Sequence, residues 1–348
     1  MTQEQQLLIE QKGHLGIIRL NRVASLNALS IEMIQGIHQQ VLAWQDNAQV
    51  QAILIASNSP KAFSAGGDIR YIYDSYYAGE NKHLGYFADE YAMLNDLYAS
   101  KKPLIALLDG YVLGGGFGLA QACHIKVTSE KSRFAMPETV IGYFPDVAAT
   151  YFLSRLDEVG VYLALTGEQI SASDALALQL VDALVEQQHL AALEQQLIQA
   201  PVLDIDSIQA LLQQYRALPA ASELQQHAAR IEQYFAHTSI AHIEQALANA
   251  EPVNQTWANS VLAILQQRSP VAKRASLILQ HLGRDLSRSQ AMVLERQVQV
   301  LWFEQGDFIE GVRALIIDKD KQPKWREDQV QLEQQISALV TEKNALSA

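Results

Sequence analysis

The sequence of 348 residues is poor in the features that mark several classes of protein. Its single cysteine, Cys123, excludes an internal disulfide bond and any zinc site built from several cysteines, and it fits a reducing compartment. The 26 Lys and Arg residues are outnumbered by 38 Asp and Glu residues, which gives a net charge of −12. Because no run of five or more basic residues reverses that charge locally, we expect no nucleic-acid partner.

Targeting signals and membrane spans are also missing. Residues 1–6 have neither the basic and apolar segments of a signal peptide nor the Arg and Ser bias of a transit peptide. The most apolar stretch, residues 104–123, contains Asp109 and five glycines, so we interpret it as a buried strand, a turn and the start of a helix. We therefore predict a soluble cytoplasmic protein that does not enter a membrane.

Several catalytic signatures have no match in the chain. The motifs of P-loop NTPases (GxxxxGKS/T), Rossmann dehydrogenases (GxGxxG), α/β-hydrolases (GxSxG) and zincins (HExxH) are absent. The nine histidines are not spaced as metal ligands, and Cys123 follows an apolar helix start, which is typical of a small core residue. We predict a protein without a metal ion or a redox cofactor.

The hydrophobic pattern divides the chain into two parts. Up to about residue 185, short β-rich runs alternate with amphipathic segments in the order strand, strand, helix, which indicates an α/β fold. Beyond residue 200 the chain is rich in Gln, Ala, Leu and Glu, and helix follows helix. We predict an α/β core over residues 1–200 and an α-helical C-terminal region over residues 201–348. The predicted helix N-caps are Ser30, Ser222, Ser269, Ser287 and Asp307, the last two with the spacing of a capping box.

Two glycine-rich turns, residues 64–68 and 114–118, each follow a predicted strand and precede a predicted helix. The first N–H groups of a helix have no intrahelical partner, so two such ends brought together would place two backbone donors around one oxygen atom. That arrangement stabilises the oxyanion of acyl transfer without a charged side chain. The alternative is that the glycines only permit tight turns.

A third segment, residues 136–146, contains two acids among apolar neighbours. Glu138 and Asp146 each follow a proline directly, which predicts that each lies in a first helical turn. Paired carboxylates in different environments suit general acid–base or nucleophilic catalysis, because their surroundings can separate their protonation states. The alternative is that both acids are ordinary helix caps.

These three elements, in this order, resemble the crotonase (enoyl-CoA hydratase/isomerase) superfamily. The resemblance implies a core of ββα turns arranged as a spiral, and a site in which the backbone N–H groups of Gly67 and Gly115 form an oxyanion hole for the thioester oxygen of an acyl-CoA. Within the superfamily the sequence is most similar to the hydrolases of 3-hydroxyisobutyryl-CoA, an intermediate of valine breakdown. That similarity extends from Leu20 to Trp325 and includes the helical region.

One position separates the hydrolase branch from the hydratase branch. Hydratases carry a glutamate three residues after the middle glycine of the triple-glycine turn, where this chain has Gly118. Asp146, in contrast, lies where hydratases usually have glycine and where hydrolases have an acid. The resemblance implies substrate contacts at Glu90, Gly115, Glu138 and Asp146, and CoA contacts at Ala65, Gly67 and Asp68.

The chain departs from the hydrolase pattern at two places. Residues 147–150 (Val-Ala-Ala-Thr) replace a more glycine-rich run, which would reshape the acyl pocket. Val23 and Ala24 stand where Pro-Lys is usual, so Arg22 or other cations would have to bind the CoA phosphates.

We therefore predict hydrolysis of 3-hydroxyisobutyryl-CoA to 3-hydroxyisobutyrate and free CoA, with no cofactor beyond the CoA of the substrate. Glu138 would activate water or attack the thioester carbon itself, and Asp146 would orient the substrate hydroxyl or assist proton transfer to the leaving thiol. Two alternatives stay open: an enoyl-CoA hydratase or isomerase that uses Glu138 as its main base, and a catalytically silent CoA-binding protein. A homo-oligomer is also compatible with the resemblance.

Overall fold

The computed structural model describes residues 5–79, 81–326, 332 and 334–339. Contacts between residues group the chain into two compact units that interleave along the sequence. Unit 1 comprises residues 1–68, 85–135 and 169–225, and unit 2 comprises residues 69–84, 136–168 and 226–348. The sequence prediction placed a single boundary near residue 200, because it could not show that two helical segments of the first half pack with the C-terminal helices.

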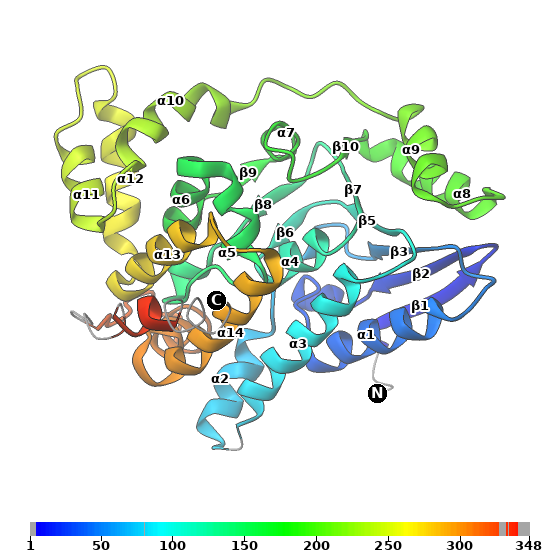
Figure 1. Ribbon diagram of the computed structural model, residues 1–348, viewed down its shortest axis with the longest axis horizontal. Coiled ribbons are helices and arrows are strands. Elements are labelled where there is room, and N and C mark those ends of the chain that lie inside the picture. Colours follow the sequence, from blue (N-terminus) through cyan, green and yellow to red (C-terminus); the bar gives the residue numbers. More distant parts are fainter. Residues whose placement is uncertain (1–4, 80, 327–331, 333, 340–348) are drawn as a thin grey trace. The chain divides into compact units, whose positions relative to one another are not determined.

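Unit 1 contains two β-sheets, whose strands are drawn as arrows in Figure 1. The larger sheet has the strand order β1 (Leu7–Lys12), β2 (Leu15–Leu20), β3 (Ala52–Ser57), β5 (Leu104–Leu108), β7 (Ile125–Thr128) and β10 (Ala183–Leu184). The smaller sheet has the order β4 (Ala62–Ser64), β6 (Tyr111–Leu113), β8 (Arg133–Ala135) and β9 (Ile170–Ser171). The β1–β2 and β8–β9 pairs are antiparallel, and the other neighbouring strands are parallel.

From β3 to β8, consecutive strands alternate between the two sheets. In the successive pairs β3–β4, β5–β6 and β7–β8, the first strand belongs to the larger sheet and the second to the smaller one. The chain continues from β4 into α2 (Ile69–Tyr77) and α3 (Lys82–Tyr98), and from β6 into α4 (Gly115–Gln121). This order confirms the predicted ββα spiral and the interpretation of residues 104–123. Because β4 and β6 are parallel neighbours, the two glycine-rich turns that follow them lie at the same edge of the smaller sheet.

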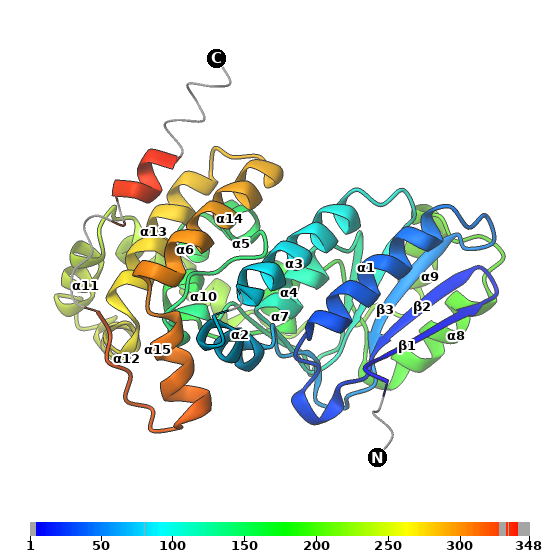
Figure 2. The same ribbon diagram turned by 90° about the horizontal axis from the view of Figure 1, so that it is seen from below.

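Different helices cover the two faces of the larger sheet. Besides α4 and most of α3, unit 1 contains the α-helices α1 (Ile31–Gln45), α7 (Ala172–Ala177), α8 (Leu190–Gln199) and α9 (Ile205–Gln213). Leu15 and Ile17 of β2 belong to a buried core that includes apolar residues of α8 and α9. Gly16 points to the opposite face, where a Cβ atom would lie 2.7 Å from the ring of Trp44 in α1. Figure 2 shows β1 to β3 between α1 and α8.

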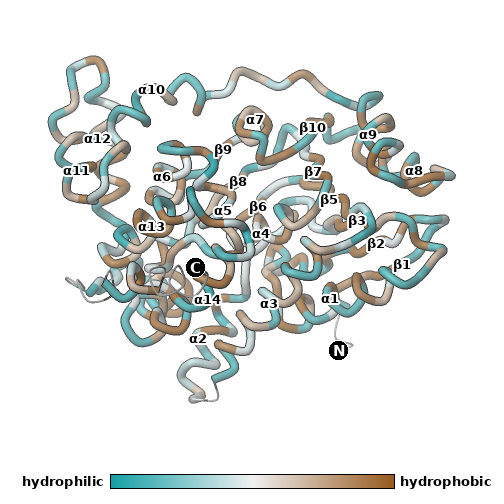
Figure 3. Tube along the Cα trace, viewed as in Figure 1, coloured by the Kyte–Doolittle hydropathy of each residue, from teal (hydrophilic) through white to brown (hydrophobic). Residues whose placement is uncertain are grey.

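The described part of unit 2 consists of helices and connecting turns. They are α2, η2 (Glu138–Ile141), α5 (Ala149–Phe152), η3 (Ser154–Leu156), α6 (Asp157–Thr166), α11 (Ile240–Ala248), α12 (Gln255–Gln267), α13 (Pro270–Gly283), α14 (Arg288–Gln305), α15 (Phe308–Val312) and η5 (Arg313–Ile317). Helix α10 (Glu223–Phe235) begins in unit 1 and continues into unit 2. Helix α13 packs on α5 and α6, α14 packs on α5, and α15 packs on α2. Along α11 and α12, hydrophilic and hydrophobic segments alternate (Figure 3), as expected of amphipathic helices. None of the helices in the described part of the chain is both long and apolar enough to cross a membrane.

Most of the predicted N-caps are confirmed. The hydroxyls that accept a backbone N–H at the start of a helix are those of Ser30, Ser222, Ser269 and Ser287. Ser287 and Gln290 form the complete capping box. The prediction was wrong for Asp307, whose carboxylate accepts hydrogen bonds from the Ser269 hydroxyl (2.7 Å) and the Arg326 N–H (3.1 Å) and does not cap α15. Both partners are distant in sequence, so the local pattern could not reveal them.

Candidate active site

The turn after β4 pairs with the chain at Leu29, and the N–H of Gly67 points away from that pairing. Leu29 pairs with this turn: its N–H donates to the Gly66 carbonyl (2.8 Å) and its carbonyl accepts from the Asp68 N–H (3.1 Å). Successive N–H groups of an extended segment point to opposite sides, so the Gly67 N–H points away from Leu29. It donates no hydrogen bond within the part of the chain that the structure describes.

The second glycine-rich turn exposes the first N–H of a helix. Gly114 has φ 49° and ψ −126°, a conformation that side chains forbid, and its N–H donates to the Ala135 carbonyl of β8 (3.0 Å). Helix α4 begins at the next residue, Gly115, whose N–H therefore has no intrahelical acceptor. Among the described residues it donates to no other group. The predicted helix is confirmed, and it begins at Gly115, within the triple glycine.

The two turns lie in contact within unit 1. A Cβ atom placed on Gly115 would lie 3.3 Å from the Gly67 nitrogen, and a Cβ atom placed on Gly66 would lie 3.5 Å from the Gly115 nitrogen. The structure thus brings together the two backbone donors that the sequence prediction selected. Two such N–H groups can bind one oxygen atom on which negative charge develops.

A buried carboxylate stands beside these donors. Glu90 of α3 is 3% exposed, and its Oε1 atom lies 2.8 Å from the position of a Cβ atom on Gly115. A Cβ atom at position 115 would come too close to this carboxylate, so the carboxylate would have to shift in any variant with a side chain there. A carboxylate in this place can accept a hydrogen bond from a hydroxyl group bound next to the donor pair.

Tyr86, which the sequence analysis did not select, holds the turn of residues 64–68 through its hydroxyl group. Its buried hydroxyl donates to the Leu29 carbonyl (2.7 Å), accepts from the Asp68 N–H (3.2 Å), and lies 2.9 Å from the position of a Cβ atom on Gly67. Tyr86 precedes Glu90 by one helical turn, so both lie on the same face of α3. That spacing of two polar side chains on a buried helical face is the signal that could have identified it.

The remaining predicted CoA contacts also lie in this turn. The Ala65 N–H donates to the Leu26 carbonyl (3.0 Å), which holds the turn to the segment before α1. The Asp68 carboxylate forms an ion pair with Arg22 (2.7 Å), and the same guanidinium donates to the Ala28 carbonyl (3.0 Å). Arg22, named above as a candidate for binding the CoA phosphates, is therefore already paired with the Asp68 carboxylate.

The two predicted catalytic acids lie in unit 2. Glu138 is 7% exposed and begins the 3-10 helix η2, so its predicted place in a first helical turn is confirmed. Asp146 is 5% exposed but lies three residues before α5, so the same prediction was wrong for Asp146. The reason is a turn at Val147 (φ 51°) and Ala148 (φ 73°), whose left-handed conformations delay the helix. Such conformations cost about 1–2 kcal/mol for each residue with a side chain.

Helix α14 supplies the polar contacts of this segment. The Gln299 side-chain amide donates to Asp146 Oδ2 (2.9 Å). The Glu295 carboxylate accepts from the N–H groups of Ala148 and Thr150, both at 2.9 Å. Sequence reasoning missed both residues. An acid and an amide four residues apart on the apolar face of a predicted helix could have indicated buried polar side chains with a specific partner.

The other sequence candidates have structural roles. Burial of Cys123 raises the pKa of its thiol to about 12, which confirms a core residue and keeps it unreactive. Within the described ranges, no cluster of three or more His, Cys, Asp or Glu side chains could hold a metal ion. Arg313 of the C-terminal motif forms ion pairs with Glu310, Asp318 and Asp320, which hold the chain after α15.

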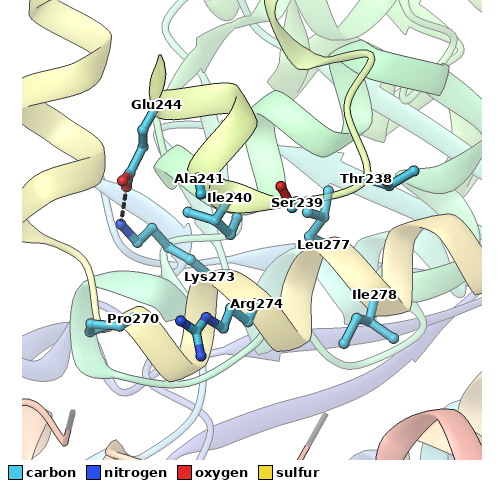
Figure 4. A pocket seen from close by; sticks show the side chains of 10 residues that line it. All are labelled: Thr238, Ser239, Ile240, Ala241, Glu244, Pro270, Lys273, Arg274, Leu277 and Ile278. Atoms are coloured by element: carbon cyan, nitrogen blue, oxygen red, sulfur yellow. Dashed lines mark hydrogen bonds and ion pairs between the residues drawn. The ribbon is translucent and has the colours of Figure 1, made fainter. Parts of the chain in front are cut away.

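Unit 2 also contains a cavity of about 490 Å³ at the start of α11 and along α13. Figure 4 shows its wall, where Lys273 forms an ion pair with Glu244 next to Ile240 and Arg274. None of the predicted site residues lines this cavity. Its size alone therefore does not make it the candidate active site.

Comparisons with known proteins agree with the resemblance seen in the sequence. The enoyl-CoA hydratase/isomerase family model matches residues 15–339. A curated relative from Gallus gallus, named mitochondrial 3-hydroxyisobutyryl-CoA hydrolase, is 37% identical over 326 residues, which cover 92% of this chain and 84% of the relative. A carnitinyl-CoA dehydratase structure from Mycobacterium thermoresistibile matches with a TM-score of 0.87 and 27% identity over 96% of both chains. An enoyl-CoA hydratase structure from Rhodobacter sphaeroides matches with a TM-score of 0.82 and 32% identity over 95% of this chain and 96% of the other.

Proposed function

Because this chain belongs to the enoyl-CoA hydratase/isomerase family, we propose that it hydrolyses 3-hydroxyisobutyryl-CoA to 3-hydroxyisobutyrate and free CoA. The observation that carries the proposal is the contact between the two turns that present the N–H groups of Gly67 and Gly115. Thioester hydrolysis needs such a donor pair, since negative charge develops on the carbonyl oxygen. The name of the Gallus gallus relative supports this choice of acyl group.

In the proposed reaction the two N–H groups bind the thioester oxygen. As an oxygen nucleophile adds to the carbonyl carbon, the charge on the thioester oxygen grows and both hydrogen bonds strengthen. One lost donor of this kind typically lowers kcat by about 10²–10³-fold. Glu90 would accept a hydrogen bond from the hydroxyl group of the acyl chain, because its carboxylate lies beside Gly115.

The acids of unit 2 supply proton transfer in this proposal. Glu138 takes a proton from water, whose oxygen forms the new C–O bond while the C–S bond breaks. Asp146 orients the substrate hydroxyl or assists protonation of the departing thiolate, which leaves as CoA thiol. Alternatively, Glu138 attacks the carbonyl carbon itself and water then hydrolyses an anhydride. Single-turnover hydrolysis in ¹⁸O-water separates the routes, since label appears in Glu138 only through the anhydride.

The two similar solved structures raise the question of hydration against hydrolysis, because one is named a dehydratase and the other a hydratase. The resemblance assigns hydratases a second glutamate at the position of Gly118. Here that position is a buried glycine within α4 and offers no carboxylate. Hydrolysis is therefore the better supported reaction, since it does not require that second acid.

The test measures two reactions side by side. Release of free thiol from 3-hydroxyisobutyryl-CoA is followed together with loss of the conjugated double bond of crotonyl-CoA. We expect thiol release and no crotonyl-CoA turnover. Crotonyl-CoA turnover without thiol release would establish the hydratase or isomerase instead, and CoA-ester binding without either reaction would favour a silent binding protein.

Three further proposals accompany this activity. Besides the thioester, the proposed reaction uses only water, and the proposal assigns no step to a metal ion. We therefore expect full activity after dialysis against a chelator. We keep the cytoplasm as the proposed location, although the Gallus gallus relative is mitochondrial by name, and cell fractionation tests it. We also expect a homo-oligomer, which the mass measured by light scattering against the 38.6 kDa chain decides.

A further inference from the structure

The chain after Asp146 adopts a conformation that its own side chains disfavour. Val147 and Ala148 both have positive φ angles, 51° and 73°. A β-branched residue such as valine is rarely found there, because its Cβ substituents crowd the backbone. A turn of this kind persists only where its surroundings hold it in place.

Glu295 of α14 holds this turn. It is fully buried, and its two carboxylate oxygens accept the Ala148 and Thr150 N–H groups at 2.9 Å each. Ala148 is the N-cap residue of α5 and has no side-chain oxygen, so it cannot bind the unpaired N–H groups of the first helical turn. Glu295 takes the role of the cap from another helix, with the added strength of a charged acceptor.

Gln299 holds the Asp146 carboxylate. It is fully buried, and its Nε2 atom donates to Asp146 Oδ2 at 2.9 Å. Its Oε1 atom accepts from the Arg296 guanidinium at 2.8 Å. A guanidinium can only donate, so Arg296 fixes which end of the amide faces Asp146.

We propose that Glu295 and Gln299 are positioning residues: Gln299 sets the direction of the Asp146 carboxylate, and Glu295 holds the strained turn that follows it. The two residues are four positions apart and lie on one face of α14, so a single helix controls both the carboxylate and its backbone. This inference rests on the proposed function, which gives Asp146 its part in catalysis.

The first test is a double-mutant cycle on thiol release from 3-hydroxyisobutyryl-CoA. Gln299→Met keeps the side-chain volume but removes the donor, and we expect kcat to fall about 10- to 100-fold, the cost of a small misplacement of a catalytic group. KM should change by less than about 3-fold, because the substrate contacts themselves remain. In the Asp146→Asn background, Gln299→Met should cost nothing further, since Gln299 acts through Asp146.

The matched control is Val300→Ala, the next residue of α14, whose side chain is 51% exposed. It should leave kcat unchanged. If Gln299→Met keeps wild-type kcat while Asp146→Asn abolishes turnover, or if the two losses multiply, the positioning role is wrong. If Asp146→Asn itself keeps full kcat, the error lies in the proposed function and not in this inference.

The second test uses glycine as a rescue. Glu295→Gln replaces one acceptor oxygen by a donor, so one of the two N–H groups loses its partner, and kcat should fall about tenfold through the displaced turn. Adding Ala148→Gly should restore at least about half of the lost activity on a logarithmic scale, because glycine adopts a left-handed conformation without a holding contact. No rescue would overturn the role of Glu295.

The third test does not depend on turnover. Amide hydrogen exchange of the full chain should show the N–H groups of Ala148 and Thr150 protected in the wild type and exchanging at least about tenfold faster in Glu295→Gln. Unchanged exchange would contradict the inference even if the protein were inactive on every CoA ester tried. Faster exchange in Glu295→Gln, together with a wild-type chain that shows no hydrolase activity, would keep the holding contact and reject the proposed function alone.

Discussion

The two groups of candidate site residues are built in opposite ways. In unit 1 the acting groups are backbone N–H donors of Gly67 and Gly115, and their value depends on the absence of side chains. In unit 2 the acting groups are the carboxylates of Glu138 and Asp146, and Asp146 is held by a side chain from α14. Adding a side chain at Gly67 or Gly115 should therefore impair the donor pair, whereas replacing the side chain of Glu138 or Asp146 should impair the carboxylates.

The largest effect is expected from Glu138→Gln, which removes the proposed base while it preserves the shape of the side chain. Thiol release from 3-hydroxyisobutyryl-CoA should fall by about 10³-fold, within the range of general-base catalysis. Glu168→Gln is the matched control in the same unit, because Glu168 is half-buried and accepts a hydrogen bond from the Tyr162 hydroxyl that glutamine can also accept. Equal losses in the two variants, or near-wild-type turnover in Glu138→Gln, would remove Glu138 from the mechanism.

The corresponding change in unit 1 adds one methyl group. In Gly115→Ala the new Cβ atom would lie 2.8 Å from the Glu90 carboxylate and 3.3 Å from the Gly67 nitrogen, so it would displace both. We expect kcat/KM to fall by about 10²–10³-fold, as for the loss of an oxyanion donor. Gly85→Ala in α3 is the control, since a Cβ atom there meets nothing within 4 Å. Comparable activity of the two alanine variants would show that the donor pair is not used.

A smaller effect is expected from Tyr86→Phe, which removes the hydroxyl that bonds to Leu29 and Asp68 at the turn of residues 64–68. Leu29 and Asp68 keep the hydrogen bond between them (3.1 Å), so the free energy of unfolding should fall by only about 0.5–1.5 kcal/mol. Because Gly67 is then held less firmly, kcat should decrease by about 3- to 10-fold. Tyr111→Phe, at an exposed tyrosine of β6, should change neither quantity. A loss of stability without any loss of kcat would limit Tyr86 to a structural role.

The same contrast explains what the sequence could and could not predict. The donor pair depends on local features: two strands, each followed by a glycine-rich turn and a helix, in a spiral that makes the strands parallel neighbours. Serine caps are equally local, and four of them were predicted correctly. Such features need only the residues within a few positions along the chain.

The carboxylate group depends on distant partners, which is why its surroundings were missed. Gln299 lies 153 positions from Asp146, and Glu295 lies 147 positions from Ala148. Their contacts hold a turn that local rules assign to a helix, so the predicted helical placement of Asp146 failed. Asp307 failed as a cap for the same reason, because Ser269 binds its carboxylate from α13.

The smallest expected effect concerns how the stability of unit 2 depends on pH. His83 of unit 2 is buried, with its ring 4.5 Å from that of Phe303 in α14 and 5.4 Å from that of Tyr76, and its Nδ1 atom has no hydrogen-bond partner among the described residues. Burial lowers the pKa of His83, so folding favours the neutral ring. The resulting stabilisation is complete above the unfolded pKa of about 6.5 and is lost as the pH falls below that value.

Thermal unfolding of the wild type and of His83→Phe, measured at pH 7.5 and pH 5.5, isolates this contribution from the other histidines. The wild type should lose about 1–2 °C more in Tm than the variant over that interval, as expected for one titrating group in a large chain. Phe303 follows Gln299 by one turn of α14, so protonation of His83 should also speed amide exchange at Ala148 and Thr150. It should leave the hydrogen-bonded amides of Asp68 and Gly114, in the two glycine-rich turns, unchanged. Equal acceleration in both glycine turns and at Ala148 would contradict the separation of the two groups and indicate loosening of the whole chain instead.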